Sequence, residues 1–190
     1  VDLDPPGEGE VLVRIRAAGL CHSDLSTVNG DRPRELPMVL GHEAAGEVLE
    51  LGPGVRDLKV GDHVILVFVP SCRHCIPCME GRPALCEPAA KANGAGTLIS
   101  GAVRLSKNGQ RVLHHVGVSA FAEHAVVSQN SVVRIDHSLP FEEAALFGCA
   151  VITGAGAVIN TAQVKPGTTA AIVGLGGVGL MGLLAARLAG

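Results

Sequence analysis

The stretch C-H-S-D-L-S-T-V-N-G-D-R-P-R-E-L-P-M-V-L-G-H-E, residues 21–43, combines a thiol, an imidazole, a hydroxyl and two carboxylates. Cysteine thiolate and histidine nitrogen are preferred zinc ligands, and a zinc ion that does chemistry takes three protein ligands and keeps one position open. Cys21 and His42 supply two such ligands. The stretch therefore predicts a metal site whose third ligand lies elsewhere in the chain, and we expect the surrounding elements to assemble it.

Each residue of this stretch also has a purely structural interpretation. A lone histidine such as His42 is more often a hydrogen-bonded polar residue than a metal ligand, and Ser23 and Asp24 are typical of the start of a helix. Their combination favours the metal site. Asp24 closely follows Cys21 and Glu43 adjoins His42, and carboxylates beside metal ligands orient an imidazole and tune the metal.

A second cluster holds four of the six cysteines in the spacing C-x2-C-x2-C-x7-C: Cys72, Cys75, Cys78 and Cys86. Four thiolates that close a tetrahedron form a structural zinc site with no open position. The alternatives are buried unpaired cysteines and an iron–sulfur cluster, but the Cys-Pro ending common in such clusters is missing, since Glu87 follows Cys86. The lobe at residues 70–88 has little core of its own, so we expect its order to depend on the metal.

The composition predicts a folded domain rather than a disordered or nucleic-acid-binding chain. Hydrophobic residues make up 47% and charged residues 17%, which provides for a core. Aromatic residues are 2%, without Trp or Tyr, and the formal net charge is −3, so stacking platforms and excess positive charge are both missing. No secretory signal is visible, which favours a cytoplasmic protein with reduced cysteines. The apolar run 170–186 contains a glycine cluster and indicates a buried strand and helix rather than a membrane span.

Short strands separated by Gly and Pro predict an all-β, barrel-like unit over roughly residues 1–140. Residues 10–16 alternate apolar and polar, the period of a half-buried strand. Further strands are expected at 46–51, 60–67, 121–127 and 132–135. Residues 89–111 show little periodicity, so we expect an irregular surface excursion there.

The sequence changes character after residue 140. Residues 141–147 and 151–162 are rich in alanine and predict helices. A short apolar strand is expected at 168–173, then Gly-Leu-Gly-Gly-Val-Gly at 174–179 and an apolar helix at 180–189. A G-x-G-x-x-G loop between a strand and a helix predicts a dinucleotide site, with glycine-rich packing of a buried turn as the alternative. The acidic residue that distinguishes NAD from NADP is expected about 20 residues further on, beyond Gly190.

The motifs follow one another along the chain: Gly19-Leu20-Cys21-His22-Ser23-Asp24, Gly41-His42-Glu43-Ala44-Ala45-Gly46, Gly61-Asp62-His63-Val64, the four cysteines, Gly148-Cys149 and the glycine loop. Together they resemble the zinc-dependent medium-chain alcohol dehydrogenases, in the form that carries a structural zinc. The resemblance implies a GroES-like β-barrel catalytic domain over residues 1–150, with the zinc lobe at 70–88. Residues 151–190 would form a linker helix and the first β-α unit of a Rossmann NAD(P)-binding domain. Family members are nearly twice as long, which indicates a fragment.

The same resemblance assigns roles to individual residues. Cys21, His42 and Cys149 would hold a catalytic zinc, although Cys149 taken alone is more typical of a core cysteine. Ser23 would begin the proton relay from the substrate hydroxyl. The other implied roles are Asp24 and Glu43 in support of the zinc ligands, His22 at the coenzyme pyrophosphate, Thr153 and Val178 beside the nicotinamide, Gly174, Gly176, Gly177 and Gly179 in the coenzyme loop, and Phe68 in the wall of the substrate pocket.

The implied activity is hydride transfer between a small-molecule alcohol and NAD or NADP, giving an aldehyde or ketone, with two Zn²⁺ per chain. The full-length form is expected to be a homo-oligomer with neither nucleic acid nor membrane as a partner. Two positions depart from family patterns. Ser26 stands where many members end the relay with a histidine, and Ala90 where the glutathione-dependent formaldehyde dehydrogenase branch has an arginine. The alternatives are a glutathione-dependent formaldehyde or polyol dehydrogenase of the same superfamily, and a truncated, non-catalytic zinc-binding scaffold.

Overall fold

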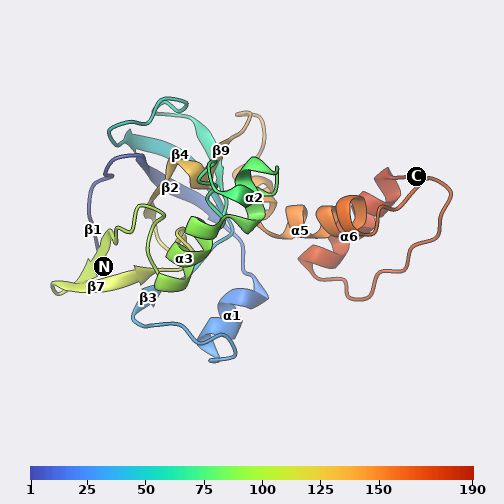
Figure 1. The fold of residues 1–190 in the computed structure, drawn as a ribbon, viewed down its shortest axis with the longest axis horizontal. Coiled ribbons are helices and arrows are strands. Elements are labelled where there is room, and N and C mark those ends of the chain that lie inside the picture. Colours follow the sequence, from blue (N-terminus) through green and yellow to red (C-terminus); the bar gives the residue numbers. More distant parts are fainter.

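The computed structural model describes residues 1–190 as a β-rich body followed by a helical lobe (Figure 1). The body contains two sheets. The larger is antiparallel throughout, in the order β8 (His124–Ser128), β2 (Glu10–Ala18), β4 (Ala44–Leu51), β5 (His63–Leu66) and β9 (Val132–Arg134). The smaller has the order β1 (Asp2–Leu3), β6 (Leu105–Lys107), β7 (Gln110–His114) and β3 (Met38–Val39), with β3 parallel to β7.

The core lies against one face of the larger sheet. In β2, Val11 and Val13 are fully buried while Arg14 is exposed, as the period-2 alternation predicts. The core is entirely aliphatic and consists of Val11, Val13, Ala44, Val48, Val64, Leu66, Val118, Ala120, Ala125 and Val127. The predicted barrel-like unit is confirmed, and its five predicted strands correspond to β2, β4, β5, β8 and β9 with ends shifted by a few residues.

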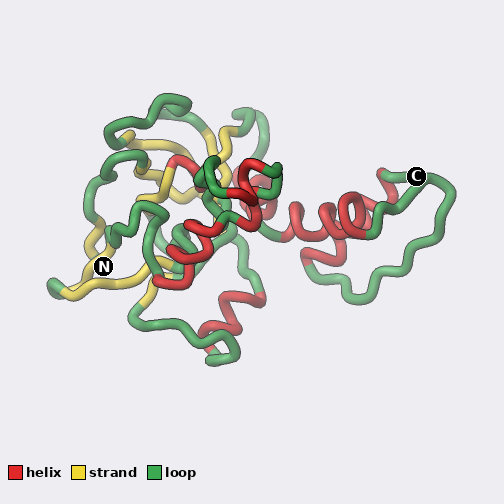
Figure 2. The backbone as a smooth tube through the Cα atoms, in the orientation of Figure 1, coloured by secondary structure: helices red, strands yellow, loops and turns green.

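Helices connect the strands of the body, and further helices form the lobe (Figure 2, red). The body carries α1 (His22–Val28), α2 (Ile76–Met79), η1 (Pro83–Leu85), α3 (Glu87–Ala95) and η2 (Gln129–Ser131). The segment that leads to the end of the chain contains α4 (Phe141–Ala144), η3 (Ala145–Gly148), α5 (Ala150–Gly156), the π-helical η4 (Ala157–Thr161) and α6 (Gly177–Leu188). The helices predicted at 141–147 and 151–162 are thus confirmed.

The predicted irregular excursion at residues 89–111 is wrong. This segment contains most of α3 and the β6–β7 hairpin. Local propensity concealed the helix, because Asn93 and Gly94 are poor helix formers. Burial of Ala89 and Ala92 compensates for that weakness, and Gly96 ends the helix in a left-handed conformation with φ +67°.

The strand predicted at residues 168–173 is also wrong. A strand requires a neighbour to satisfy its backbone hydrogen bonds, and no segment of this chain pairs with these residues. Val173 is consequently 99% exposed. The helix predicted after the glycine loop is confirmed as α6, which packs against α5.

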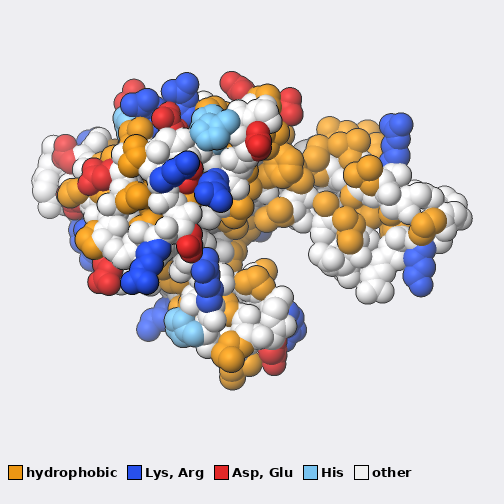
Figure 3. Space-filling view, turned by 90° about the horizontal axis from the view of Figure 1, so that it is seen from above, with side chains coloured by type: hydrophobic (Ala, Val, Ile, Leu, Met, Phe, Trp, Pro, Cys, Tyr) orange, Lys and Arg blue, Asp and Glu red, His pale blue; other side chains and the backbone are white.

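The surface of the helical lobe is more apolar than that of the β-rich body. Figure 3 shows hydrophobic side chains over much of the lobe, with only a few charged side chains, whereas both signs of charge are scattered over the body. No single helix is long and apolar enough to cross a membrane, and only the bent pair Phe141–Gly148 and Ala150–Thr161 has the combined length and composition.

Candidate metal centres and active site

Three side chains that are far apart in the sequence converge beside α1. One ligand atom each of Cys21, His42 and Cys149 lies within 4.8 Å of the others. Cys21 directly precedes α1, His42 lies between β3 and β4, and Cys149 lies between η3 and α5. Two sulfurs and a ring nitrogen suit a zinc ion with a fourth position open for chemistry. We call these three residues the Cys-His-Cys group.

Gly148 allows Cys149 to reach this group. A Cβ atom at Gly148 would collide with the carbonyl oxygen of Leu66 at the end of β5. The main chain therefore passes this close to the sheet because residue 148 has no side chain. Cys149 itself is 9% exposed, so its burial is that of a core cysteine even though its sulfur meets two other donors.

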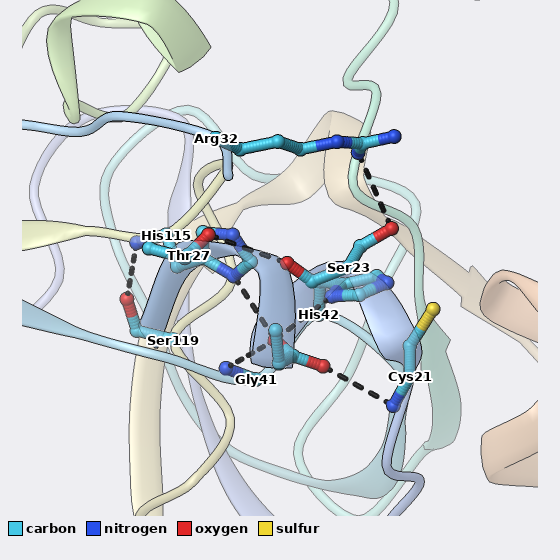
Figure 4. A network of polar contacts seen from close by, with 9 residues as sticks. Cys21, Ser23, Thr27, Arg32, Gly41, His42, His115 and Ser119 are labelled. Atoms are coloured by element: carbon cyan, nitrogen blue, oxygen red, sulfur yellow. Dashed lines mark hydrogen bonds and ion pairs between the residues drawn. The ribbon is translucent and has the colours of Figure 1, made fainter. Parts of the chain in front are cut away.

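A single buried carboxylate organises the group. Oδ1 of Asp24 lies 3.1 Å from Nδ1 of His42 and accepts a hydrogen bond from the Gly41 N–H at 3.2 Å, while Oδ2 accepts one from the Cys21 N–H at 3.3 Å (Figure 4). Burial alone would raise the pKa of Asp24, but contacts with His115 and His42 hold that pKa well below its usual range. Asp24 is therefore ionised. Because its carboxylate contacts Nδ1 of His42, the other ring nitrogen, Nε2, remains available for a metal.

The same contacts change the pKa of His42. Burial alone would lower that pKa, but the hydrogen bond to Asp24 and the contact with Cys149 outweigh it and raise the pKa to about 10. An imidazole held this firmly by a carboxylate is oriented before any ligand binds. Phe68 adds an edge-on contact, with its ring centroid 5.6 Å from that of His42.

His115 is a further buried member of this network. Its Nδ1 lies 3.3 Å from Oδ1 of Asp24, and its ring meets the His42 ring edge-on at 5.4 Å. The backbone N–H of His115 donates to Oγ of Ser119 at 3.0 Å (Figure 4). Asp24, His42 and His115 also have ligand atoms within 4.8 Å of one another, but the Asp24 oxygen involved already serves His42. Asp24 and His115 are therefore interpreted as a support for the Cys-His-Cys group, and not as part of a second metal site.

Glu43 helps to position Cys149, the third member of the Cys-His-Cys group. Its Oε1 accepts a hydrogen bond from the backbone N–H of Ala150 at 2.9 Å, and its side chain is buried. Ala150 is the first residue of α5 and follows Cys149. This contact therefore ties the start of β4 to the helix that carries the third sulfur.

The four cysteines of the lobe form a closed group of their own. The sulfurs of Cys72, Cys75, Cys78 and Cys86 all lie within 4.8 Å of one another. Backbone N–H groups point at them, from Cys72 to Sγ of Cys86 and from Cys75 to Sγ of Cys72, each at 3.3 Å. A hydrogen bond with Ser71 lowers the pKa of Cys78 to about 6, whereas burial raises that of Cys86 to about 11. Four thiol sulfurs at this separation fit a tetrahedral structural zinc, as the spacing predicts.

Two cavities meet at the Cys-His-Cys group. A cleft of about 640 Å³, the glycine-loop cleft, is lined by the glycine loop, His22, Glu43 and Cys149. A pocket of about 270 Å³, the arginine pocket, is lined on one side by Ser23, Thr27, Arg32 and Arg34 and on the other by His42, Phe68, Asn93, His115, Val116 and Cys149. Because Cys149 lines both, the group stands at the boundary between them.

The glycine loop has a backbone that only glycine permits. Gly174 has φ +92°, and a Cβ atom at Gly179 would collide with the carbonyl oxygen of Gly174. The loop leads into α6, and Gly177, Val178 and Gly179 at the start of this helix line the cleft, which is where an anion site at a helix N-terminus would lie.

Comparison with known proteins places these features in a family. The family model of the alcohol dehydrogenase GroES-like domain matches residues 7–137. The chain belongs to the zinc-dependent medium-chain alcohol dehydrogenase family. An S-(hydroxymethyl)glutathione dehydrogenase of Synechocystis sp. is 45% identical over 190 residues, which is all of this chain and 52% of that protein.

Solved structures agree with the assignment. An alcohol dehydrogenase zinc-binding domain protein from Burkholderia ambifaria superposes with a TM-score of 0.92 at 39% identity, over 99% of this chain and 51% of that one. The benzyl alcohol dehydrogenase of Acinetobacter calcoaceticus superposes with a TM-score of 0.87 at 37% identity, over 100% of this chain and 51% of that one. The chain thus spans about half the length of the relatives it matches.

Most of the residues singled out in the sequence lie at the two cavities. His22, Val178 and the four glycines Gly174, Gly176, Gly177 and Gly179 line the glycine-loop cleft, and Ser23 and Phe68 line the arginine pocket. Thr153 lines neither cavity, although its neighbour Gly154 lines the cleft. Ser26 is buried, and its Oγ lies 3.3 Å from Nδ1 of His22.

Four residues at the Cys-His-Cys group and the arginine pocket were not predicted from the sequence. Arg32 and Arg34 lie within the quoted stretch 21–43, so their pairing was a visible signal of positive charge beside the metal ligands. His115 and Asn93 carried no local signal. His115 directly follows β7, and Asn93 lies on α3, within the segment 89–111 that the sequence predicts to be irregular.

Proposed function

We propose that the protein is a zinc-dependent oxidoreductase that transfers hydride between an alcohol and NAD(P), giving an aldehyde or ketone. The observation that carries this proposal is the position of the Cys-His-Cys group, with the glycine-loop cleft on one side and the arginine pocket on the other. Hydride transfer requires coenzyme and alcohol to meet at one point, and Cys149 lines both cavities. Residues 1–150 would form the catalytic domain and residues 151–190 the start of the coenzyme domain.

The donor sets fit two zinc ions. Cys21, His42 and Cys149 would hold a catalytic zinc, and the four lobe cysteines a structural one. A catalytic zinc of this kind supplies Lewis-acid chemistry, which lowers the pKa of a bound alcohol. Asp24 orients His42, and Glu43 holds Ala150 so that Cys149 stays in place.

The chain's own residues would handle the alcohol proton. Ser23 lines the arginine pocket and offers a hydroxyl to accept that proton. At the position where many relatives have a relay histidine, Ser26 is paired with the exposed imidazole of His22 at 3.3 Å. His22 is therefore an exposed ionisable group at that end of α1, and we assign it the exit of the proton to solvent.

The coenzyme would bind in the glycine-loop cleft. Gly174, Gly176, Gly177 and Gly179 allow a pyrophosphate to approach the backbone at the start of α6. His22 would contact the pyrophosphate there, and Val178 and Thr153 would lie beside the nicotinamide, which supplies the hydride chemistry.

For the substrate, the relatives favour the thiol-adduct alternative over a simple alcohol. The curated relative at 45% identity is an S-(hydroxymethyl)glutathione dehydrogenase, so we propose S-(hydroxymethyl)glutathione as the substrate. The similarity to a benzyl alcohol dehydrogenase supports a second candidate, an aromatic alcohol. We also expect the full-length protein to form a homo-oligomer.

Zinc content and coenzyme reduction test the proposal together. Zinc per chain is measured for the wild type, Cys149→Ala and Cys75→Ser, and NAD(P)H formation is followed with S-(hydroxymethyl)glutathione and benzyl alcohol. Two zinc ions, one of them lost in Cys149→Ala together with all NAD(P)H formation, would support the dehydrogenase. A single zinc, lost only in Cys75→Ser, with no coenzyme reduction, would instead support a non-catalytic zinc-binding scaffold.

A further inference from the structure

The arginine pocket carries positive charge that nothing in the chain neutralises. Arg32 and Arg34 line it, and no Asp or Glu does. Neither guanidinium has a carboxylate oxygen within the 4.0 Å that defines an ion pair. The carboxylate beneath the pocket, Asp24, is occupied by His42 and His115. A pocket of this kind favours a ligand that brings its own negative charge.

Both arginines are held against the wall of the pocket by hydrogen bonds. Nη1 of Arg32 donates to Oγ of Ser23 at 3.3 Å (Figure 4), and Nη1 of Arg34 donates to the carbonyl oxygen of Asn93 at 3.0 Å. The first bond places a guanidinium beside the hydroxyl that would accept the alcohol proton. The bond from Arg34 connects the loop after α1 to α3. Both guanidinium groups therefore have a hydrogen-bond partner that also lines the arginine pocket.

Asn93 contributes an acceptor without a partner. Its Nδ2 donates to the carbonyl oxygen of Phe68 at 2.8 Å, which fixes the orientation of the amide. Its Oδ1 is then buried with no hydrogen-bond partner. A buried acceptor left in this state costs free energy, and a ligand N–H that reaches it removes the cost.

We propose that Arg32, Arg34 and Asn93 determine substrate specificity by recognising the carboxylate and amide groups of a peptide-thiol adduct. This inference rests on the proposed function and identifies the residues that would select its substrate. Guanidinium forks match a carboxylate, and Oδ1 of Asn93 matches a peptide N–H. Ala90 on α3 is exposed and does not line the pocket, so the positive charge comes from the loop after α1 instead.

The test compares alcohols that differ only in charge. Benzyl alcohol and 4-(hydroxymethyl)benzoate share a ring and a hydroxymethyl group, and only the second carries a carboxylate. For the zinc-loaded protein we expect a higher kcat/KM with the carboxylated alcohol. In Arg32→Gln and Arg34→Gln the ratio of the two kcat/KM values should fall about tenfold each, and in the double variant about a hundredfold. Because both kcat/KM values are measured with the same variant, a general loss of activity leaves their ratio unchanged.

Control variants distinguish an effect of the arginines' charge on substrate preference from a general effect on the structure. Arg32→Lys and Arg34→Lys keep the charge and should retain part of the preference. Arg111→Gln, at an exposed arginine on β7 outside the pocket, should leave the ratio unchanged. Asn93→Ala should lower kcat/KM for S-(hydroxymethyl)glutathione more than for 4-(hydroxymethyl)benzoate, which has no amide N–H.

Calorimetric binding of S-methylglutathione supplies a readout that needs no turnover. The double Arg→Gln variant should bind it about a hundredfold more weakly than the wild type. Equal binding, together with an unchanged ratio of kcat/KM values, would overturn the inference even if benzyl alcohol is oxidised. Loss of binding in a protein that oxidises no alcohol would refute the proposed function and leave the anion site standing.

Discussion

Oδ1 of Asp24 lies 3.1 Å from Nδ1 of His42, inside a site where both side chains are buried. The other oxygen of the same carboxylate accepts the N–H of Cys21 at 3.3 Å. One side chain thus positions two of the three proposed zinc ligands, from the start of α1 and from the loop before β4. Asp24 thus has a local role in the first turn of α1 and also a role in positioning residues of the proposed metal centre, one of which comes from a distant part of the sequence.

Asp24→Asn should weaken this centre selectively. Asparagine keeps the size of the side chain but loses the charge that holds His42, so the affinity of the Cys-His-Cys group for zinc should fall about 10–100-fold. Competition with a chromophoric chelator measures this affinity, and the four-cysteine group should stay loaded. Asp57→Asn, at an exposed carboxylate between β4 and β5, is the matched control. Unchanged zinc affinity in Asp24→Asn would contradict the positioning role.

Removal of zinc should disorder the four-cysteine lobe but not the β-rich core. The lobe contains only one-turn helices, α2 and η1, and the apolar side chains Ile76 and Met79 are exposed there, so the metal must supply its order. Limited trypsin digestion after chelation should cleave first after Arg73, which is exposed between two of the cysteines. Equal resistance before and after chelation would show that the lobe folds without metal.

Stability should fall in mild acid because of His114. Burial, with Arg104 nearby, lowers the pKa of His114 from 6.5 to about 4, and its Nε2 accepts a hydrogen bond from the Arg104 N–H at 3.0 Å. Since the folded-state pKa lies below the unfolded value, the unfolded chain binds more protons between these limits. The contribution, on the order of 3 kcal/mol, is complete above pH 6.5 and is lost as the pH falls toward 4.

Urea unfolding at several pH values measures this effect. His114→Gln should flatten the dependence of the unfolding free energy on pH, because glutamine does not titrate. His124→Gln, at an exposed histidine on β8, should retain the wild-type slope. Equal slopes in all three proteins would show that His114 is not the titrating group.

Gly179→Ala should abolish coenzyme binding. A methyl group there would collide with the carbonyl oxygen of Gly174 and force the loop open. Fluorescence titration with NADH or NADPH should therefore detect no binding at concentrations that saturate the wild type. Gly94→Ala, in α3 where a Cβ atom meets nothing within 4 Å, should bind coenzyme normally and be neutral or slightly more stable. Normal binding by Gly179→Ala would exclude the glycine loop as the coenzyme site.

Elements with a strong local pattern were predictable, and elements that depend on neighbours were not. Residues 10–16 alternate with period 2, and β2 forms there because its apolar face meets a core. Residues 168–173 are just as apolar, but no strand lies beside them and none forms. In α3 the opposite occurred, since burial of Ala89 and Ala92 stabilised a helix that Asn93 and Gly94 concealed.

The four-cysteine group and the glycine loop could be identified from the sequence alone, because ligands or glycines only a few residues apart have few geometries open to them. Cys21 and His42 are far apart in the sequence, and only their residue types and the carboxylates beside them indicated a metal site. Three other relationships depend on the three-dimensional fold: Cys149 joins Cys21 and His42, His115 supports Asp24, and Arg32 and Arg34 share a pocket with Asn93. These residues come from segments whose separation in space depends on the order of strands in the sheets and on close passages such as that at Gly148. No local pattern encodes those distances, because they result from packing of the whole chain.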